Sequence, residues 1–128
     1  MTQAPRSFSA AVILVLVNAL IWLVFAIIVT TGLHPAIPDS GLVRGVMGIL
    51  AFLTSGALLI LSILLRRRNT IAFYITLALL LIISVLTVTD EFGIYDLIVL
   101  IITLIPLVLI IKNRTWCLSR ETQLTHRE

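Results

Sequence analysis

Two charged residues, Arg44 and Asp96, lie inside long apolar runs of this chain. Arg44 comes just after Gly41, and Asp96 lies a little beyond Glu91, so both are close to the ends of their runs. A carboxylate at that depth in a membrane costs on the order of 1–3 kcal/mol unless it is paired or hydrated. Their matching depths predict a structural ion pair between Arg44 and Asp96. An outward-facing anion or proton site is the alternative.

Neutral polar side chains also occur within the apolar runs. Asn18 lies near the middle of the first run, where an amide usually hydrogen-bonds to a neighbouring helix. We therefore expect a structural contact, with a substrate contact as the alternative. Thr76, Ser84 and Thr87 share one face of the third run, and Thr103 belongs to the fourth. Such hydroxyls can donate to carbonyls one turn earlier in the same helix, so they do not by themselves indicate a polar pathway.

The residues that most often carry catalysis or bind metals are few. His34 lies near Asp39 without HxxH or HExxH spacing, and Cys117 is the single cysteine, which excludes an intramolecular disulfide and a CxxC pair. We expect a solvated loop histidine and a reduced thiol in the tail, with acylation of Cys117 as the alternative. The sequence predicts no catalytic residue, no cofactor site and no metal site, and hence no enzyme.

Four apolar runs set the fold class: residues 9–33, 42–65, 71–89 and 92–111. Each has about the 20 residues that a helix needs to cross the roughly 30 Å hydrocarbon layer. The sequence therefore predicts an all-α integral membrane bundle of four antiparallel transmembrane helices, arranged as two helical hairpins. Residues 1–128 are expected to form one such domain, because 60% of the chain is hydrophobic and only 12% is charged.

The ends of the runs predict short connections. The first run is longer than the 7–15 apolar residues of a signal peptide and lacks a convincing cleavage site, so we expect it to be the first span. Prolines and polar residues at 34–39 predict a loop after it. Asp90 is the predicted N-cap of the fourth span, which leaves a tight hairpin between the third and fourth spans.

The basic residues are distributed asymmetrically. Of nine lysines and arginines, all but Arg44 lie near the N-terminus, in the 66–70 loop or in the basic C-terminal tail, residues 112–128. Four of the six acids are predicted at the opposite end: Asp39, Asp90, Glu91 and Asp96. The positive-inside rule then predicts a multi-pass protein of the cell membrane with cytoplasmic N- and C-termini. We attribute the net charge of +3 to this topology and expect no nucleic-acid partner.

Small residues follow one face of the second run. At 100° per residue, a narrow arc contains Gly41, Arg44, Gly48, Ala51, Ser55 and Ser62. Small side chains let two helices approach closely in a membrane. Packing within the same chain is the main expectation, and a homo-oligomer or a larger membrane complex formed through the second span is the alternative.

These features predict a small multi-pass membrane protein that is not an enzyme and acts as a packing or accessory protein through helix–helix contacts. A small oligomeric transporter or channel subunit is the first alternative, although the first span holds no ionisable residue. A membrane sensor or signalling component that uses the outer charged cluster is the second. The lipid bilayer is the one partner that the composition requires.

Overall fold

The computed structural model describes residues 5–35, 39–89 and 93–118. Over these residues the chain forms four helices and no strand: α1 (Arg6–Thr31), α2 (Gly41–Arg66), α3 (Thr70–Thr89) and α4 (Ile94–Lys112). Each helix is long and apolar enough to cross a membrane. The all-α prediction is confirmed, and the helix ends fall within about three residues of the predicted limits.

A glycine ends α1, and an asparagine side chain caps the start of α3. Gly32 follows α1 in the left-handed conformation, with φ of 76°, and its N–H donates to the carbonyl of Val29 over 3.1 Å. Glycine adopts this conformation without the cost that a Cβ atom imposes. Asn69 caps α3, since its side-chain oxygen accepts from the N–H groups of Ile71 and Ala72 over 2.9 and 3.2 Å. This cap satisfies amides that have no partner inside the helix.

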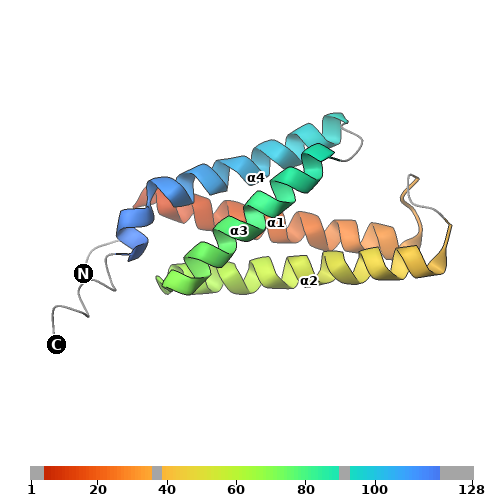
Figure 1. Ribbon diagram of the computed structural model, residues 1–128, viewed down its shortest axis with the longest axis horizontal. Coiled ribbons are helices and arrows are strands. Elements are labelled where there is room, and N and C mark those ends of the chain that lie inside the picture. The colour runs from red at the N-terminus through yellow and green to blue at the C-terminus, as the bar shows by residue number, and fades with distance from the viewer. Residues whose placement is uncertain (1–4, 36–38, 90–92, 119–128) are drawn as a thin grey trace.

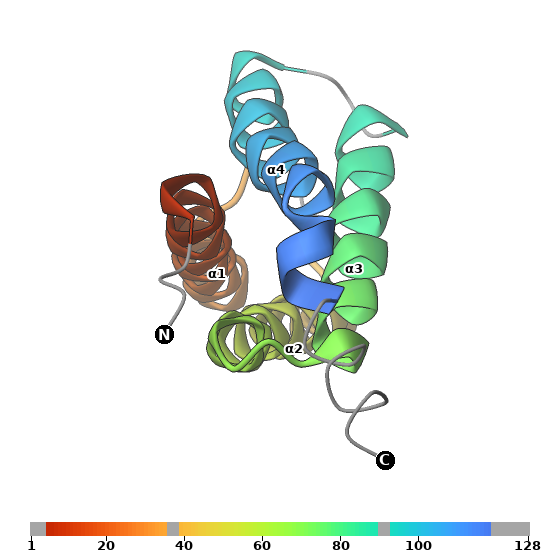
Figure 2. The same cartoon turned by 90° about the vertical axis from the view of Figure 1, so that its left-hand side faces the viewer.

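The helices follow one another around the bundle in the order α1, α2, α3, α4 (Figure 2). The hairpin of α1 and α2 is closely packed along its length, whereas α3 and α4 cross it at an angle (Figure 1). The tips of the two hairpins therefore lie apart, while the opposite ends of the helices converge. The predicted bundle of two hairpins is present, but its hairpins diverge toward their tips.

The core is built from side chains of all four helices. Small residues of α1, such as Ala11, Val15 and Ala19, are completely buried and allow close approach of its neighbours. Larger buried side chains fill the space between helices: Phe8, Leu58, Leu65, Phe73, Leu80, Ile83 and Ile110. The outward faces carry many exposed leucine, isoleucine and valine side chains, as expected for helices whose outer surface meets lipid.

Candidate functional site

The most internal polar contact joins α1 to α4. The side-chain amide of Asn18 donates to the carbonyl of Ile102 over 3.0 Å and to the carbonyl of Leu14 over 3.1 Å. Its oxygen accepts from the Thr103 hydroxyl over 2.9 Å, and both side chains are completely buried. The structural contact predicted for Asn18 is confirmed. Sequence analysis did not predict Thr103 as its partner, because hydropathy does not define how two helices are rotated against each other.

A second polar contact joins the same part of α1 to α2. Ser55 is buried, and its hydroxyl donates to the carbonyl of Ala19 over 2.8 Å. Because Ala19 follows Asn18 directly, adjacent residues of α1 hydrogen-bond to two different helices. Interhelical hydrogen bonds of this kind contribute about 0.6 kcal/mol on average in membrane proteins. Together they define the rotation of α1 against α2 and α4.

The remaining hydroxyls discussed above bond within their own helix. Thr76 donates to the carbonyl of Ala72 over 2.7 Å, and Ser84 donates to the carbonyl of Leu80 over 2.8 Å. Thr87 follows the same pattern one turn later. These bonds satisfy the hydroxyls locally, as predicted. They do not connect into a chain of polar groups along α3.

The small-residue stripe of α2 packs largely within the chain. Gly48, Ala51, Ser55 and Ser62 are buried, and a Cβ atom at Gly48 would overlap the Cγ2 atom of Thr30 on α1. The expectation of internal packing is confirmed for this part of the stripe. Gly41 differs, because it is exposed and has open space around its Cα atom.

The predicted ion pair between Arg44 and Asp96 is wrong. Arg44 pairs with Asp39, which precedes α2, and its guanidinium lies close to Gly32. Asp96 accepts from the N–H of Gly93 over 2.9 Å and so caps α4. The side chain of Asp39 is 91% exposed and that of Arg44 is 30% exposed, so the pair lies at the surface, where ion pairs contribute little.

Two features of the structure keep Arg44 and Asp96 apart. Arg44 and Asp96 belong to the ends of different hairpins, and these ends diverge (Figure 1). Each residue also finds a partner close to it in sequence, which costs less chain entropy than a contact across the bundle. The predicted N-cap, Asp90, lies outside the described residues, and Gly93 occupies the N-cap position of α4.

The histidine of the first loop packs against an aromatic side chain. The ring centroid of His34 lies 5.7 Å from that of Phe25, and Phe25 lies 5.6 Å from Trp22, both in edge-to-face geometry. The prediction of a solvated loop histidine is therefore wrong, because His34 is half-buried against α1. Among residues 5–35, 39–89 and 93–118, no three metal-ligating side chains gather at one place.

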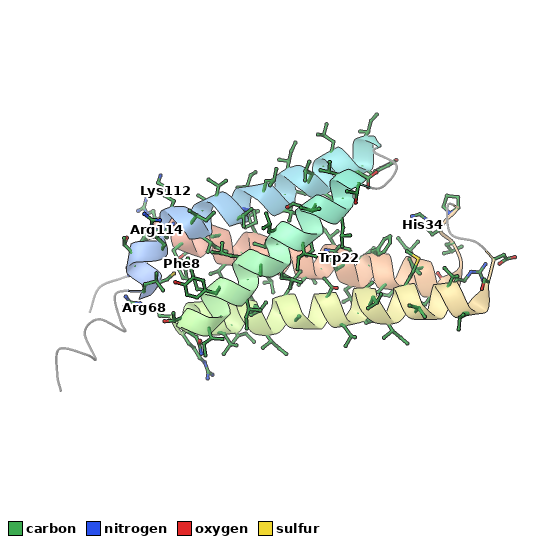
Figure 3. The ribbon with its side chains drawn as sticks, in the orientation of Figure 1. Phe8, Trp22, His34, Arg68, Lys112 and Arg114 are labelled. Carbon is green, nitrogen blue, oxygen red and sulfur yellow. The ribbon has the colours of Figure 1, made fainter. Side chains whose placement is uncertain are left out.

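The opposite end of the bundle carries a cluster of basic side chains, hereafter the basic collar. It consists of Arg6, Arg66, Arg67, Arg68, Lys112 and Arg114. Figure 3 shows Arg68, Lys112 and Arg114 at this end and His34 at the other. The described acids, Asp39 and Asp96, are both at the end that holds His34. The charge separation predicted from sequence is therefore present across the described part of the chain.

A short helical turn, residues 114–118, folds over the bundle end inside the basic collar. The ring of Trp116 lies 4.6 Å from that of Phe8, and the guanidinium carbon of Arg68 lies 4.2 Å from the Trp116 ring. Arg68 also donates to the Trp116 carbonyl and adopts a left-handed φ of 56°. Left-handed backbone costs a non-glycine residue roughly 1–2 kcal/mol, and the cation–π contact offsets a comparable amount.

Other contacts secure the same turn. Ser7 donates to the side-chain oxygen of Asn113 over 3.0 Å, which connects the start of α1 to the end of α4. Cys117 is buried at 2% exposure in the core cluster. Burial raises the pKa of the Cys117 thiol to about 11, and the positive charge of Arg68 opposes this only in part. The prediction placed Cys117 in a polar tail, whereas the structure packs it against the bundle, and a buried thiol with a raised pKa is expected to react slowly.

The structure therefore brings polar groups from distant parts of the chain together in two kinds of place: at Asn18 and Ser55 inside the bundle, and at the end that carries the basic collar. No protein-family model, curated protein or solved structure matches this chain. Its four apolar helices are compatible with a small multi-pass membrane protein.

Proposed function

We propose that this chain is a non-enzymatic accessory protein of the membrane that acts through helix–helix contacts with another subunit. The main support for this proposal is an outward face of α2, where glycines with free space around them alternate with large exposed apolar side chains. Gly45, Ile49, Phe52, Gly56 and Ile60 recur at spacings of three and four residues and so form one stripe. This stripe lies beside the buried one, since Phe52 is four residues from Gly48 and three from Ser55.

Space around the two glycines supports the proposal. Nothing lies within 4 Å of a Cβ atom built at Gly45 or at Gly56. The large members of the stripe, Ile49, Phe52 and Ile60, are 61%, 44% and 60% exposed. Glycines between bulky residues make shallow notches that receive side chains of a second helix, and dispersion then favours close packing.

The polar contacts inside the spans support an accessory role over transport. Asn18 and Thr103 hydrogen-bond across α1 and α4, and Ser55 of α2 hydrogen-bonds to α1. Thr76 and Ser84 hydrogen-bond within their own helix, α3. A carrier or pump usually has ionisable groups along its route through the membrane. The described spans instead use their central polar groups to hold helices together.

Topology is the second part of the proposal. The basic collar brings together bases from the start of α1, the α2–α3 connection and the end of α4. By the positive-inside rule this end faces the cytoplasm, together with the N- and C-termini. The Arg44–Asp39 pair then lies on the outer side.

A double change on the outward face tests the helix-contact role. Gly45→Leu with Gly56→Leu should abolish the larger species that chemical crosslinking detects in mild detergent, while the thermal midpoint of the protein is unchanged. A species of twice the chain mass identifies a second copy, and a heavier, mixed species identifies a larger complex. Ala78→Leu, a change of similar size at an exposed position of α3, is the matched control.

Crosslinked species that persist in the Gly45→Leu, Gly56→Leu variant would contradict the use of this face. Solute or ion flux through the purified protein in proteoliposomes would contradict the accessory role itself. The two results are independent, because flux requires no particular partner on α2.

A further inference from the structure

The basic collar has a composition that no other surface of the described chain shares. Its exposed members come from three separate segments: Arg6 at the start of α1, Arg66 and Arg67 at the end of α2, and Lys112 and Arg114 at and just after the end of α4. The described acids, Asp39 and Asp96, lie at the other end of the bundle. Among the described residues no acid lies beside the collar, and the clustered basic side chains add to one another's positive potential.

The collar adjoins exposed apolar surface. Lys112 directly follows Ile111, and Arg66 follows Ile63 by one turn, and both isoleucines are exposed. Ile71 is exposed at the start of α3 at the same end. A phospholipid has the same order of parts, an acyl region followed by a charged phosphate. A lipid whose chains cover these isoleucines would therefore bring its phosphate to the level of the basic groups.

The helix ends at this level add to the attraction. α1 and α3 begin here, and neither has an acidic residue in its first turn. The N-cap of α1 is Pro5, which supplies no side-chain acceptor for the first amides of the helix. The positive ends of the two helix dipoles thus reinforce the basic side chains. Arg66 and Lys112 lie at the negative ends of α2 and α4 and neutralise them.

We propose that the basic collar selects the phosphate headgroups of anionic phospholipids over those of zwitterionic ones. Juxtamembrane clusters of four to eight bases attract anionic lipid with about 1 kcal/mol per base, and the collar falls within that range. The selection is independent of the proposed helix contact on α2. It is also independent of which side of the membrane the collar faces.

Tryptophan quenching by brominated lipid tests this selection close to the collar. The chain has two tryptophans, and Trp116 lies inside the collar against Phe8 and Arg68. A Trp22→Phe variant therefore reports from the collar alone. It is reconstituted in vesicles of phosphatidylcholine and phosphatidylglycerol, in which the same mole fraction of either lipid carries bromine.

We expect brominated phosphatidylglycerol to be enriched about fivefold around Trp116 relative to brominated phosphatidylcholine. The enrichment should fall toward one in about 1 M salt, where the Debye length is about 3 Å. Changing Arg66, Lys112 and Arg114 together to Gln should also reduce it toward one. Arg66→Lys with Arg114→Lys, which keeps the charge, should retain it.

The second tryptophan supplies the internal control. In a Trp116→Phe variant, Trp22 reports from α1 away from the collar, and the two brominated lipids should quench it equally. Equal quenching of Trp116 by the two lipids in the Trp22→Phe protein would overturn the proposal. An acidic protein segment would then be the better candidate for binding at the collar. Selectivity that survives the triple Gln change would overturn it as well. Helical circular dichroism of each variant establishes that these readings come from folded protein.

Discussion

Asn18 of α1 accepts a hydrogen bond from Thr103 of α4, and its amide donates to the carbonyl of the preceding residue, Ile102. One buried side chain thus makes two contacts with adjacent residues of a second helix. Both require α1 and α4 to keep one relative rotation and one relative height. This contact is the most specific restraint between the two hairpins in the described chain.

Removing the Asn18 amide should destabilise the bundle. Asn18→Leu loses both contacts with α4 and should lower the free energy of unfolding by about 1 kcal/mol. Thr103→Val should cost less, because the bond between Asn18 and Ile102 remains. The double variant should resemble Asn18→Leu, since the two changes share a contact. Unfolding by denaturing detergent measures these values.

Thr87→Val is the control for the Asn18 experiment, because the Thr87 hydroxyl bonds within its own helix. Its effect should be small. Fully additive losses for Asn18→Leu and Thr103→Val would show that their hydrogen bond contributes nothing to stability.

Steric contact between Gly48 and Thr30 gives a second prediction. Gly48→Ala places a methyl group against the Cγ2 atom of Thr30, and such overpacking typically costs about 1–3 kcal/mol. Thr30→Ser removes that methyl group, keeps the hydroxyl that bonds to Ala26, and should restore most of the stability. Thermal unfolding in detergent measures both effects.

Gly45→Ala is the matched control for Gly48→Ala. It lies three residues earlier on the same helix with no atom within 4 Å of the added methyl group. It should be neutral or slightly stabilising, because alanine favours the helix over glycine. Equal destabilisation by the two alanines would contradict the packing of α2 against α1.

A labelling test of the proposed topology needs an accessible thiol, and the buried Cys117 does not provide one. In a Cys117→Ala background, Thr115→Cys and Ser40→Cys place exposed thiols at opposite ends of the bundle. A membrane-impermeant reagent should label Ser40→Cys in intact cells and Thr115→Cys only after permeabilisation. The reverse pattern would invert the proposed orientation.

The buried thiol should also show a defined pH response. Its folded pKa is about 11, above the ordinary value of 9.0, so the folded state holds this proton more tightly than the unfolded state does. The stability that this group contributes is therefore present below pH 9 and is lost as the pH rises toward 11. Cys117→Ala should lack this loss in alkaline unfolding experiments.

Reactivity supplies an independent measure of the same burial. The native thiol should react slowly with a disulfide reagent at neutral pH and rapidly in denaturant. Thr115→Cys in the Cys117→Ala background, two residues away and exposed, should react rapidly in both conditions. Equal rates for the two folded proteins would show that the turn at residues 114–118 does not cover Cys117.

Sequence reasoning predicted the elements of this fold well and its tertiary contacts less well. Apolar length alone locates the spans, because a helix must satisfy its own backbone across hydrocarbon. The sequence places Arg44 and Asp96 near the ends of their apolar runs, but this placement does not tell which hairpin ends meet. Asp39 and Gly93 supplied nearer partners, and the pair did not form.

The polar contacts also show that sequence can identify a residue that needs a partner without identifying the partner. Asn18 was recognisable as an interhelical residue because an amide in an apolar run requires a partner. The identity of Thr103 depended on the rotation of α4, which the apolar periodicity leaves undefined, since α4 is apolar on nearly all sides. The burial of Cys117 could not be predicted, because it depends on side chains far away in sequence, such as Phe8 and Phe73 of the same core cluster.

The divergence of the hairpins has a consequence for the membrane around the protein. At the basic collar the four helices converge, and at the hairpin tips they occupy a wider cross-section (Figure 1). A tapered molecule displaces unequal areas of the two leaflets. Lipids can accommodate it most easily where the leaflet around the tips is already expanded, so the protein should gather in membrane that is concave on the side of the collar.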